Sequence, residues 1–209
     1  MDYVDLLLLS YADDTWIRIH WLANPAIAET LNMPYHHLPP HALLPRLERL
    51  FQLQLLQARR DTGETYSFFT PAHEEIAEAL TRSFWDESAF DYGLTEHGGA
   101  LWERAVHAQW ERYVYELYGS PLEPAPQPGE IITTSREQTE RHLSALRDYT
   151  GTIVLHHTVT WATLTPWQAT YWKTLPMGVQ ARFLYDECDD EAYPSEPPLE
   201  KRWYTLAEA

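Results

Sequence analysis

The spacing of apolar residues predicts two helices in the first quarter of the chain. Apolar side chains in Tyr3–Leu22 recur near helical spacing, which predicts a helix interrupted around Asp13 and Asp14. From His41 onward, apolar side chains recur at steps of three and four residues, at Leu43, Leu44, Leu47, Leu50 and Phe51. Because this spacing places them on one face, we expect an amphipathic helix that packs its apolar side against a core.

A β-hairpin and a further helix are expected next. Leu55–Arg60 and Thr65–Phe69 flank Asp61–Glu64, whose residues favour a tight turn, and this order predicts a hairpin. Pro71 suits the first position of a helix, because a backbone N–H at that position has no partner within the helix and proline lacks this group. We expect that helix to run to Leu80.

The next pattern predicts a short strand that leads directly into a capped helix. Asp91–Leu94 is expected to be extended, and Thr95 is a suitable N-cap. Glu96 suits the positive end of the helix dipole. Apolar residues then continue on one broad face to Leu117, and Gly119 is expected to end the helix.

Residues 121–129 are rich in proline and predict a linker. It separates a helical domain at 1–120 from an α/β domain with an acidic tail at 130–209. We therefore expect an α+β protein whose C-terminal half contains about four strands and two helices. The elements expected there are a strand at Glu130–Thr134, a helix capped by Ser135 that ends near Tyr149, a strand at Ile153–Trp161, a short helix from Thr165 to Trp172 and a strand at Val179–Tyr185.

The N-terminal half resembles a known family. Helix, hairpin and helix in the order expected over His41–Leu80 look like a winged-helix element. The stretch from Tyr92 to Gly98, Tyr-Gly-Leu-Thr-Glu-His-Gly, resembles the end of the wing in MarR- and PadR-type winged-helix regulators. The resemblance implies a winged-helix-like N-terminal half and, as an alternative function, a DNA-binding transcriptional regulator. The nucleic-acid contacts of that alternative are Arg46, Arg49, Arg59 and Arg60.

The charge of the chain opposes that alternative. The sequence has 31 Asp and Glu residues against 15 Lys and Arg residues, which gives a formal net charge of -16. Such a field repels phosphate backbones and favours basic partners. A local basic patch can still act within the screening distance of about 8 Å, so the DNA-binding alternative stays open. We expect a basic protein partner, such as a toxin, rather than nucleic acid.

The histidines and the single cysteine, residue types that often act in catalysis, do not have the spacing or surroundings of a catalytic site. Two prolines separate His37 from His41, which rules out the helical spacing of a metal site. His156 and His157 lie in a predicted strand, so their rings point to opposite faces. Cys188 is surrounded by carboxylates, which disfavour the reactive thiolate. We expect no catalytic site, metal or cofactor, and an enzyme that uses the scattered histidines is the third class of function considered.

The aromatic segment Trp161–Trp172, which the acidic tail follows, is the strongest candidate for a binding site. Trp and Tyr anchor protein interfaces, and acidic residues beside them would steer association toward a basic surface. A packed core between helix and sheet explains the same aromatic residues equally well. The residues predicted to bind a partner are Trp161, Trp167, Tyr171, Trp172, Asp186, Glu187, Asp189 and Asp190.

The start of the chain and its single cysteine predict a cytoplasmic protein. Acidic residues stand where a signal peptide would be basic, and the apolar run Leu6–Leu9 is too short to span a membrane. One cysteine permits no disulfide within the chain, which is typical of a reducing compartment. Together these features favour a non-catalytic, acidic, protein-binding regulator of the immunity or antitoxin kind, which inhibits a basic partner.

Overall fold

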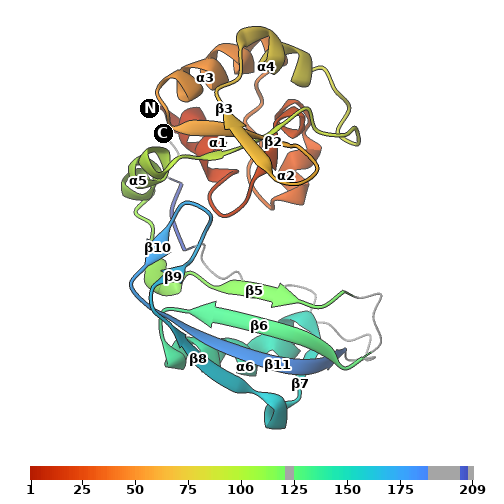
Figure 1. The fold of residues 1–209 in the computed structure, drawn as a ribbon, viewed down its shortest axis with the longest axis vertical. Helices are drawn as coiled ribbons and strands as arrows, with labels where there is room; N and C mark the ends of the chain where they lie inside the picture. Colours follow the sequence, from red (N-terminus) through yellow and green to blue (C-terminus); the bar gives the residue numbers. More distant parts are fainter. Residues whose placement is uncertain (121–124, 188–202, 207–209) are drawn as a thin grey trace. The chain divides into compact units, whose positions relative to one another are not determined.

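A computed structural model describes residues 1–120, 125–187 and 203–206 of the chain (Figure 1). Within these ranges the protein is α+β, with six α-helices and three antiparallel sheets. The chain divides into two compact units. Unit 1 contains Met1–His107, Thr170–Lys173 and the described residues after 204. Unit 2 contains the remaining described residues from 108 onward, so the division falls earlier than the linker expected at 121–129, of which 121–124 lie outside the described residues.

Unit 1 is built on a four-stranded antiparallel sheet with the order β1-β4-β2-β3. Its strands are β1 (Ile17–Arg18), β2 (Leu56–Asp61), β3 (Tyr66–Phe69) and β4 (Asp91–Leu94). Its helices are α1 (Tyr3–Ser10), α2 (Ala26–Thr30), α3 (Pro40–Gln52), α4 (His73–Ala79), α5 (Glu96–Ala105) and the 3-10 helix η1 (Ile19–Ala23). Helices α3 and α4 pack against each other, and α1 packs against α5.

Several predicted elements of unit 1 are confirmed. The helix expected from His41 is α3, and the expected hairpin is formed by β2 and β3. The strand expected at Asp91–Leu94 has those bounds as β4. Thr95 caps α5, because its Oγ1 accepts a hydrogen bond of 2.9 Å from the backbone N–H of Gly98.

Two expectations for unit 1 are wrong at helix ends. The helix expected over Tyr3–Leu22 does not resume after its interruption, because α1 ends at Ser10 and the apolar residues that follow are buried in β1 and the 3-10 helix η1. Short apolar runs of this kind fit a helix and a strand equally well. The helix expected to reach Leu117 ends at Ala105, and His107 then adopts a left-handed φ of 52°, which turns the chain out of the helix.

Unit 2 contains a five-stranded antiparallel sheet in which β5, β6, β11 and β7 are neighbours and β8 also pairs with β11. A second sheet consists of β9 and β10. The strands are β5 (Tyr115–Tyr118), β6 (Gln127–Thr133), β7 (Thr152–Val154), β8 (Thr160–Leu164), β9 (Trp167–Gln168), β10 (Thr174–Leu175) and β11 (Gly178–Glu187). The helices are α6 (Arg136–Thr150) and the 3-10 helices η2 (Trp110–Arg112) and η3 (His156–Thr158).

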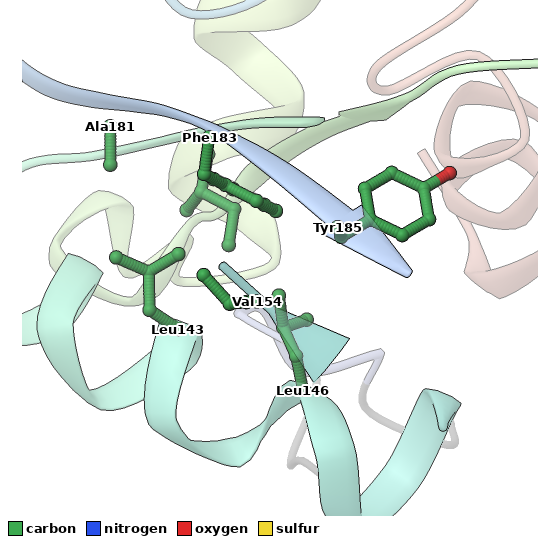
Figure 2. Packing of buried hydrophobic residues seen from close by; sticks show 7 residues of the cluster. Leu143, Leu146, Val154, Ala181, Phe183 and Tyr185 are labelled. Atoms are coloured by element: carbon green, nitrogen blue, oxygen red, sulfur yellow. The ribbon is translucent and has the colours of Figure 1, made fainter. Parts of the chain in front are cut away.

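Helix α6 covers one face of the large sheet, and the core of unit 2 lies between them (Figure 2). Leu143 and Leu146 of α6 pack against Ala181, Phe183 and Tyr185, which are alternate residues of β11 and therefore share a face. Burying this apolar surface is what holds the helix on the sheet. The even-numbered residues of β11 lie on the opposite face of the sheet.

The helix predicted after Ser135 is confirmed as α6, and local sequence signals explain both of its ends. The Ser135 hydroxyl accepts a hydrogen bond of 3.2 Å from the N–H of Gln138. At the other end Gly151 has a φ of 70°, the left-handed conformation that glycine adopts at low cost.

The C-terminal half departs from the expected four strands and two helices. In its described part it contains the six strands β6 to β11 and the single α-helix α6. Ile153–Trp161 is divided among β7, η3 and β8. The helix expected from Thr165 to Trp172 is wrong, because β9 pairs with β10 and Thr170–Lys173 forms the turn that joins them. In the described ranges no helix is long and apolar enough to cross a membrane.

Candidate protein-binding surface

One face of the sheet in unit 1 carries a group of aromatic and arginine side chains. Strands β2 and β3 pair so that Arg59 lies opposite Phe68 and Asp61 lies opposite Tyr66. Because alternate residues of a strand share a face, Arg59, Phe68 and Tyr66 project to the same side. Ala58, on the opposite side of β2, is fully buried. Arg59, Tyr66 and Phe68 therefore lie on the face of the hairpin that points away from buried Ala58.

Trp16 links these side chains through direct ring contacts. The Arg59 guanidinium carbon lies 4.5 Å from the ring centre of Trp16 and 4.1 Å from that of Tyr66. The ring centres of Trp16 and Phe68 are 5.7 Å apart. We call Trp16, Arg59, Tyr66 and Phe68 the aromatic–arginine surface. Tyr66 is 45% exposed and Phe68 is 60% exposed, so the surface presents apolar area to a partner.

Gly93 and Tyr171 hold Trp16 in place. A Cβ on Gly93 would lie 2.9 Å from Cε3 of Trp16, so the indole fits there because residue 93 has no side chain. The ring of Tyr171 lies 4.8 Å from that of Trp16. The Tyr171 hydroxyl donates a hydrogen bond of 2.7 Å to the carbonyl of Ala12 and accepts one from the N–H of Leu94. Burial raises the pKa of this hydroxyl, which favours its protonated, hydrogen-bond-donating form.

A polar pocket of about 410 Å³ adjoins the surface at Arg59. Trp85, at its rim, is 86% exposed, the highest value among the exposed large apolar side chains of the described residues. The pocket brings cations and carboxylates together beside this indole. Its lining includes Arg18, Arg59, Arg60, Asp61, Trp85 and Asp91. Tryptophan and arginine are enriched in protein interfaces, so the exposed indole and the arginines favour a protein-binding surface here.

The four arginines predicted to contact nucleic acid are all engaged with carboxylates. Arg46 and Arg49 lie on α3, and Arg59 and Arg60 lie on β2. A phosphate would have to displace a carboxylate to reach any of these guanidinium groups through the same contact. The ion pairs are Arg46 with Asp2 (2.8 Å) and with Asp5 (3.0 Å), Arg49 with Asp5, Arg59 with Asp91 (3.4 Å) and Arg60 with Glu75 (3.1 Å).

The aromatic residues predicted to anchor a partner do not form one exposed surface. Trp167 is 2% exposed and Trp172 is 8% exposed, so both are core residues. Trp161 is half-buried in unit 2, where the guanidinium of Arg136 covers its ring at 4.3 Å. Tyr171 belongs to unit 1 and supports Trp16. The packed-core explanation of these aromatics, which the sequence left open, accounts for Trp167 and Trp172.

The acidic residues predicted beside those aromatics are described only in part. Asp186 is half-buried in β11, and Glu187 is the last residue of that strand. Asp189 and Asp190 lie outside the described residues, as does Cys188. Of the acidic residues predicted to bind a partner, the structure therefore describes only the two that belong to β11.

Buried histidines are a feature that the sequence did not reveal. His36 is 5% exposed, its Nε2 lies 2.7 Å from the carbonyl of Leu22, and its Nδ1 accepts a hydrogen bond from the N–H of Leu38. His20 is fully buried, with Nε2 at 3.3 Å from the carbonyl of Phe84. Both are held by backbone groups. Across the described parts of the chain, no three His, Cys, Asp or Glu side chains are grouped as metal ligands would be.

The alternation of polar and apolar residues in β2 and β3 carries part of the signal for the aromatic–arginine surface. It places Tyr66 and Phe68 on one side of the hairpin, but it does not tell which side faces the core. Trp16 joins the group only through the fold. Comparison with known proteins adds nothing to this assignment, because no family model, curated protein or solved structure matches the chain.

Proposed function

We propose that this chain is a non-catalytic protein-binding regulator that contacts a basic partner through the aromatic–arginine surface and the adjoining Trp85. The observation that carries the proposal is the exposure of Phe68 (60%) and Trp85 (86%) beside arginines that are already fixed in position. Large aromatic side chains and arginine supply most of the binding energy in protein interfaces. Rigid side chains of this kind also lose little conformational entropy on binding.

The charge of the chain supports a basic partner. A net charge of -16 accelerates the encounter with a positively charged protein and slows the encounter with nucleic acid. An inhibitor of the immunity or antitoxin kind fits this combination, because toxins that act on nucleic acids carry basic surfaces that an acidic inhibitor can cover. A cytoplasmic site of action is part of the proposal, and the single cysteine supports it.

A winged-helix-like arrangement of unit 1 is a further part of the proposal. Helix α3 followed by the β2–β3 hairpin, and β4 leading into the Thr95 cap of α5, support the resemblance to winged-helix regulators. The paired arginines of α3 and β2 favour a protein ligand over DNA for this unit. A fold alone does not determine which of the two it binds.

The proposal is tested by purifying the tagged chain from its native host after nuclease treatment, in parallel with Phe68→Ala and Trp85→Ala variants. We expect a basic protein to co-purify in stoichiometric amount and its recovery to fall about tenfold in each variant, as for an interface anchor. Leu53→Ala is the matched control, because Leu53 is an apolar residue of unit 1 that is 53% exposed and lies outside the surface. Recovery with this control should equal that of the unmodified chain.

The inhibitory role requires a second readout. The captured protein should be toxic when expressed alone and harmless when the unmodified chain is co-expressed, and Trp85→Ala should weaken the protection. Equal recovery of the partner by the Phe68→Ala, Trp85→Ala and Leu53→Ala variants would show that the surface is assigned wrongly. A partner that is not toxic would remove the immunity or antitoxin assignment and leave the binding surface intact.

A further inference from the structure

The large sheet of unit 2 has a hollow on the face opposite α6. Ala181 and Phe183 of β11 face the helix, so Arg182 and Leu184 lie on the other side. The strand register places Leu117 of β5 on this side as well, because it lies opposite Glu130, which in turn lies opposite Arg182. A pocket of about 460 Å³ is found there. Its lining includes Leu117, Pro128, Glu130, Thr160, Arg182 and Leu184.

The pocket has the size and composition of a small-molecule site. Ligand pockets in proteins measure about 300–1,000 Å³, are mainly apolar and contain a few placed polar groups. Here Leu117, which is 55% exposed, and Leu184 supply apolar walls. Thr160 and the pair of Arg182 with Glu130 supply the polar groups. Removing the exposed area of Leu117 from water would favour an apolar ligand group.

Arg182 is held in a geometry that leaves donors for a ligand. Its Nε donates a hydrogen bond of 2.7 Å to Glu130, whose side chain is 19% exposed, while the Arg182 side chain is 66% exposed. Within the described residues the two terminal nitrogens of this guanidinium have no hydrogen-bond partner. These nitrogens present parallel N–H groups that match the two oxygens of a carboxylate.

We propose that this pocket binds a small amphipathic carboxylate, with its apolar chain against Leu117 and Leu184 and its carboxylate on the terminal nitrogens of Arg182. Glu130 fixes the guanidinium and limits its positive charge, so the apolar contacts contribute a large share of the affinity. The net charge of -16 weakens the approach of an anion, but screening confines that effect to about 8 Å, and Arg182 lies at the site itself. This site is independent of the surface proposed in unit 1.

The head group is tested on the unmodified chain with octanoate and octylamine, which have the same apolar chain and opposite charges. Titration followed by backbone amide NMR should give saturable shifts in β5, β6, β8 and β11 with octanoate. Octylamine should bind about tenfold more weakly or not at all, because an ammonium group cannot accept hydrogen bonds from the terminal N–H groups of Arg182. Equal binding of the two compounds, or the absence of saturable shifts in these strands, would overturn the proposal.

Three variants test the role of Arg182. Arg182→Gln should weaken octanoate binding about tenfold and remove the preference over octylamine. Arg141→Gln is the matched control, because Arg141 is an exposed arginine of α6 that pairs with Glu137 at 3.1 Å and does not line the pocket; its octanoate affinity should not change. Glu130→Gln keeps a side-chain oxygen that can accept the Nε–H of Arg182 and removes the competing negative charge, so it should tighten octanoate binding. Weaker octanoate binding in Glu130→Gln, with folding intact, would contradict the proposal.

Discussion

The indole of Trp172 lies directly on the backbone of Gly99, where an added Cβ would come within 2.1 Å of the Trp172 Cε3 atom. The indole N–H donates a hydrogen bond of 2.6 Å to the carbonyl of Asp13. Its ring meets that of Trp102 edge to face, with the centres 6.0 Å apart. A residue from late in the chain therefore packs into the core of unit 1, most of which comes from the first 107 residues.

We expect Gly99→Ala to lower the free energy of unfolding by about 1–3 kcal/mol, because overpacking forces Trp172 or α5 to move. Helix propensity alone predicts the opposite sign, a gain of about 1 kcal/mol for alanine in a helix interior. Urea denaturation followed by circular dichroism measures the difference. His97→Ala, at an exposed position of the same helix, is the control and should change stability by less than about 0.5 kcal/mol.

The contact is isolated by repeating Gly99→Ala in a Trp172→Ala background. Trp172→Ala should itself cost about 3–5 kcal/mol, the usual range for a buried tryptophan. With the indole removed, Gly99→Ala should become neutral or stabilising, so the two substitutions should be strongly non-additive. Additive changes in the free energy of unfolding would mean that the Trp172 indole is not what makes an alanine at position 99 unfavourable.

The carboxylate of Asp5 is a second point at which unit 1 should be sensitive. Asp5 is 1% exposed, and it pairs with Arg46 at 3.0 Å and with Arg49. Asp5→Asn keeps the shape and removes the charge, so we expect a loss of about 1–3 kcal/mol in urea denaturation. Glu140→Gln, which breaks the exposed pair with Arg136, should cost less than about 1 kcal/mol. Equal costs for the two variants would contradict the importance of burial at Asp5.

The buried histidines predict a loss of stability on mild acidification. Burial lowers the pKa of His36 and of His20, so each takes up a proton at a lower pH in the folded chain than in the unfolded chain, where protonation begins near pH 6.5. Stability should therefore be greatest above pH 6.5 and fall as the pH drops below it. The limiting slope is about 1.4 kcal/mol per pH unit for each histidine.

His36→Gln provides the test of that prediction. The variant should be less stable than the unmodified chain at neutral pH, because the hydrogen bonds to the Leu22 carbonyl and the Leu38 N–H are disturbed. Its stability should nevertheless depend less steeply on pH between 7.5 and 5.5, when urea midpoints and slopes are compared. The same pH dependence in both proteins would show that His36 does not contribute to it.

Local signals in the sequence were sufficient to predict those elements whose ends are determined by neighbouring residues. Thr95 and Ser135 each cap the helix that follows them, and Gly151 ends α6, so these bounds follow from neighbouring residues. The β2–β3 hairpin likewise depends on its own turn. The end of α5 could not be predicted, because the left-handed residue there is His107 and not a glycine.

The burial of Trp167 and Trp172 could not be predicted from the sequence, because it depends on residues that lie far away along the chain. Trp167 and Trp172 have the composition of an interface anchor, and sequence spacing cannot distinguish this from a core. Burial of Trp172 depends on Gly99 and Asp13, far away in sequence. Conversely, Trp16 belongs to the aromatic–arginine surface only because Gly93 leaves room for its ring.

The ion pairs of unit 1 predict that the chain does not bind duplex DNA. Arg59 pairs with Asp91 at 3.4 Å and Arg60 pairs with Glu75 at 3.1 Å, so each would have to exchange a carboxylate for a phosphate. A chain with a net charge of -16 gains little from that exchange. Fluorescence anisotropy with a short labelled duplex at low salt should therefore show no binding.

The double variant Asp91→Asn with Glu75→Gln tests whether the ion pairs prevent DNA binding, because it removes both carboxylates and leaves Arg59 and Arg60 in place. If the pairing is what prevents binding, the double variant should gain weak duplex binding that disappears as salt rises. Binding by the unmodified chain, lost in Arg59→Gln and Arg60→Gln, would instead establish the DNA-binding alternative. The carboxylates would then have to act as groups that a phosphate displaces, and the exposed Phe68 and Trp85 would need another explanation.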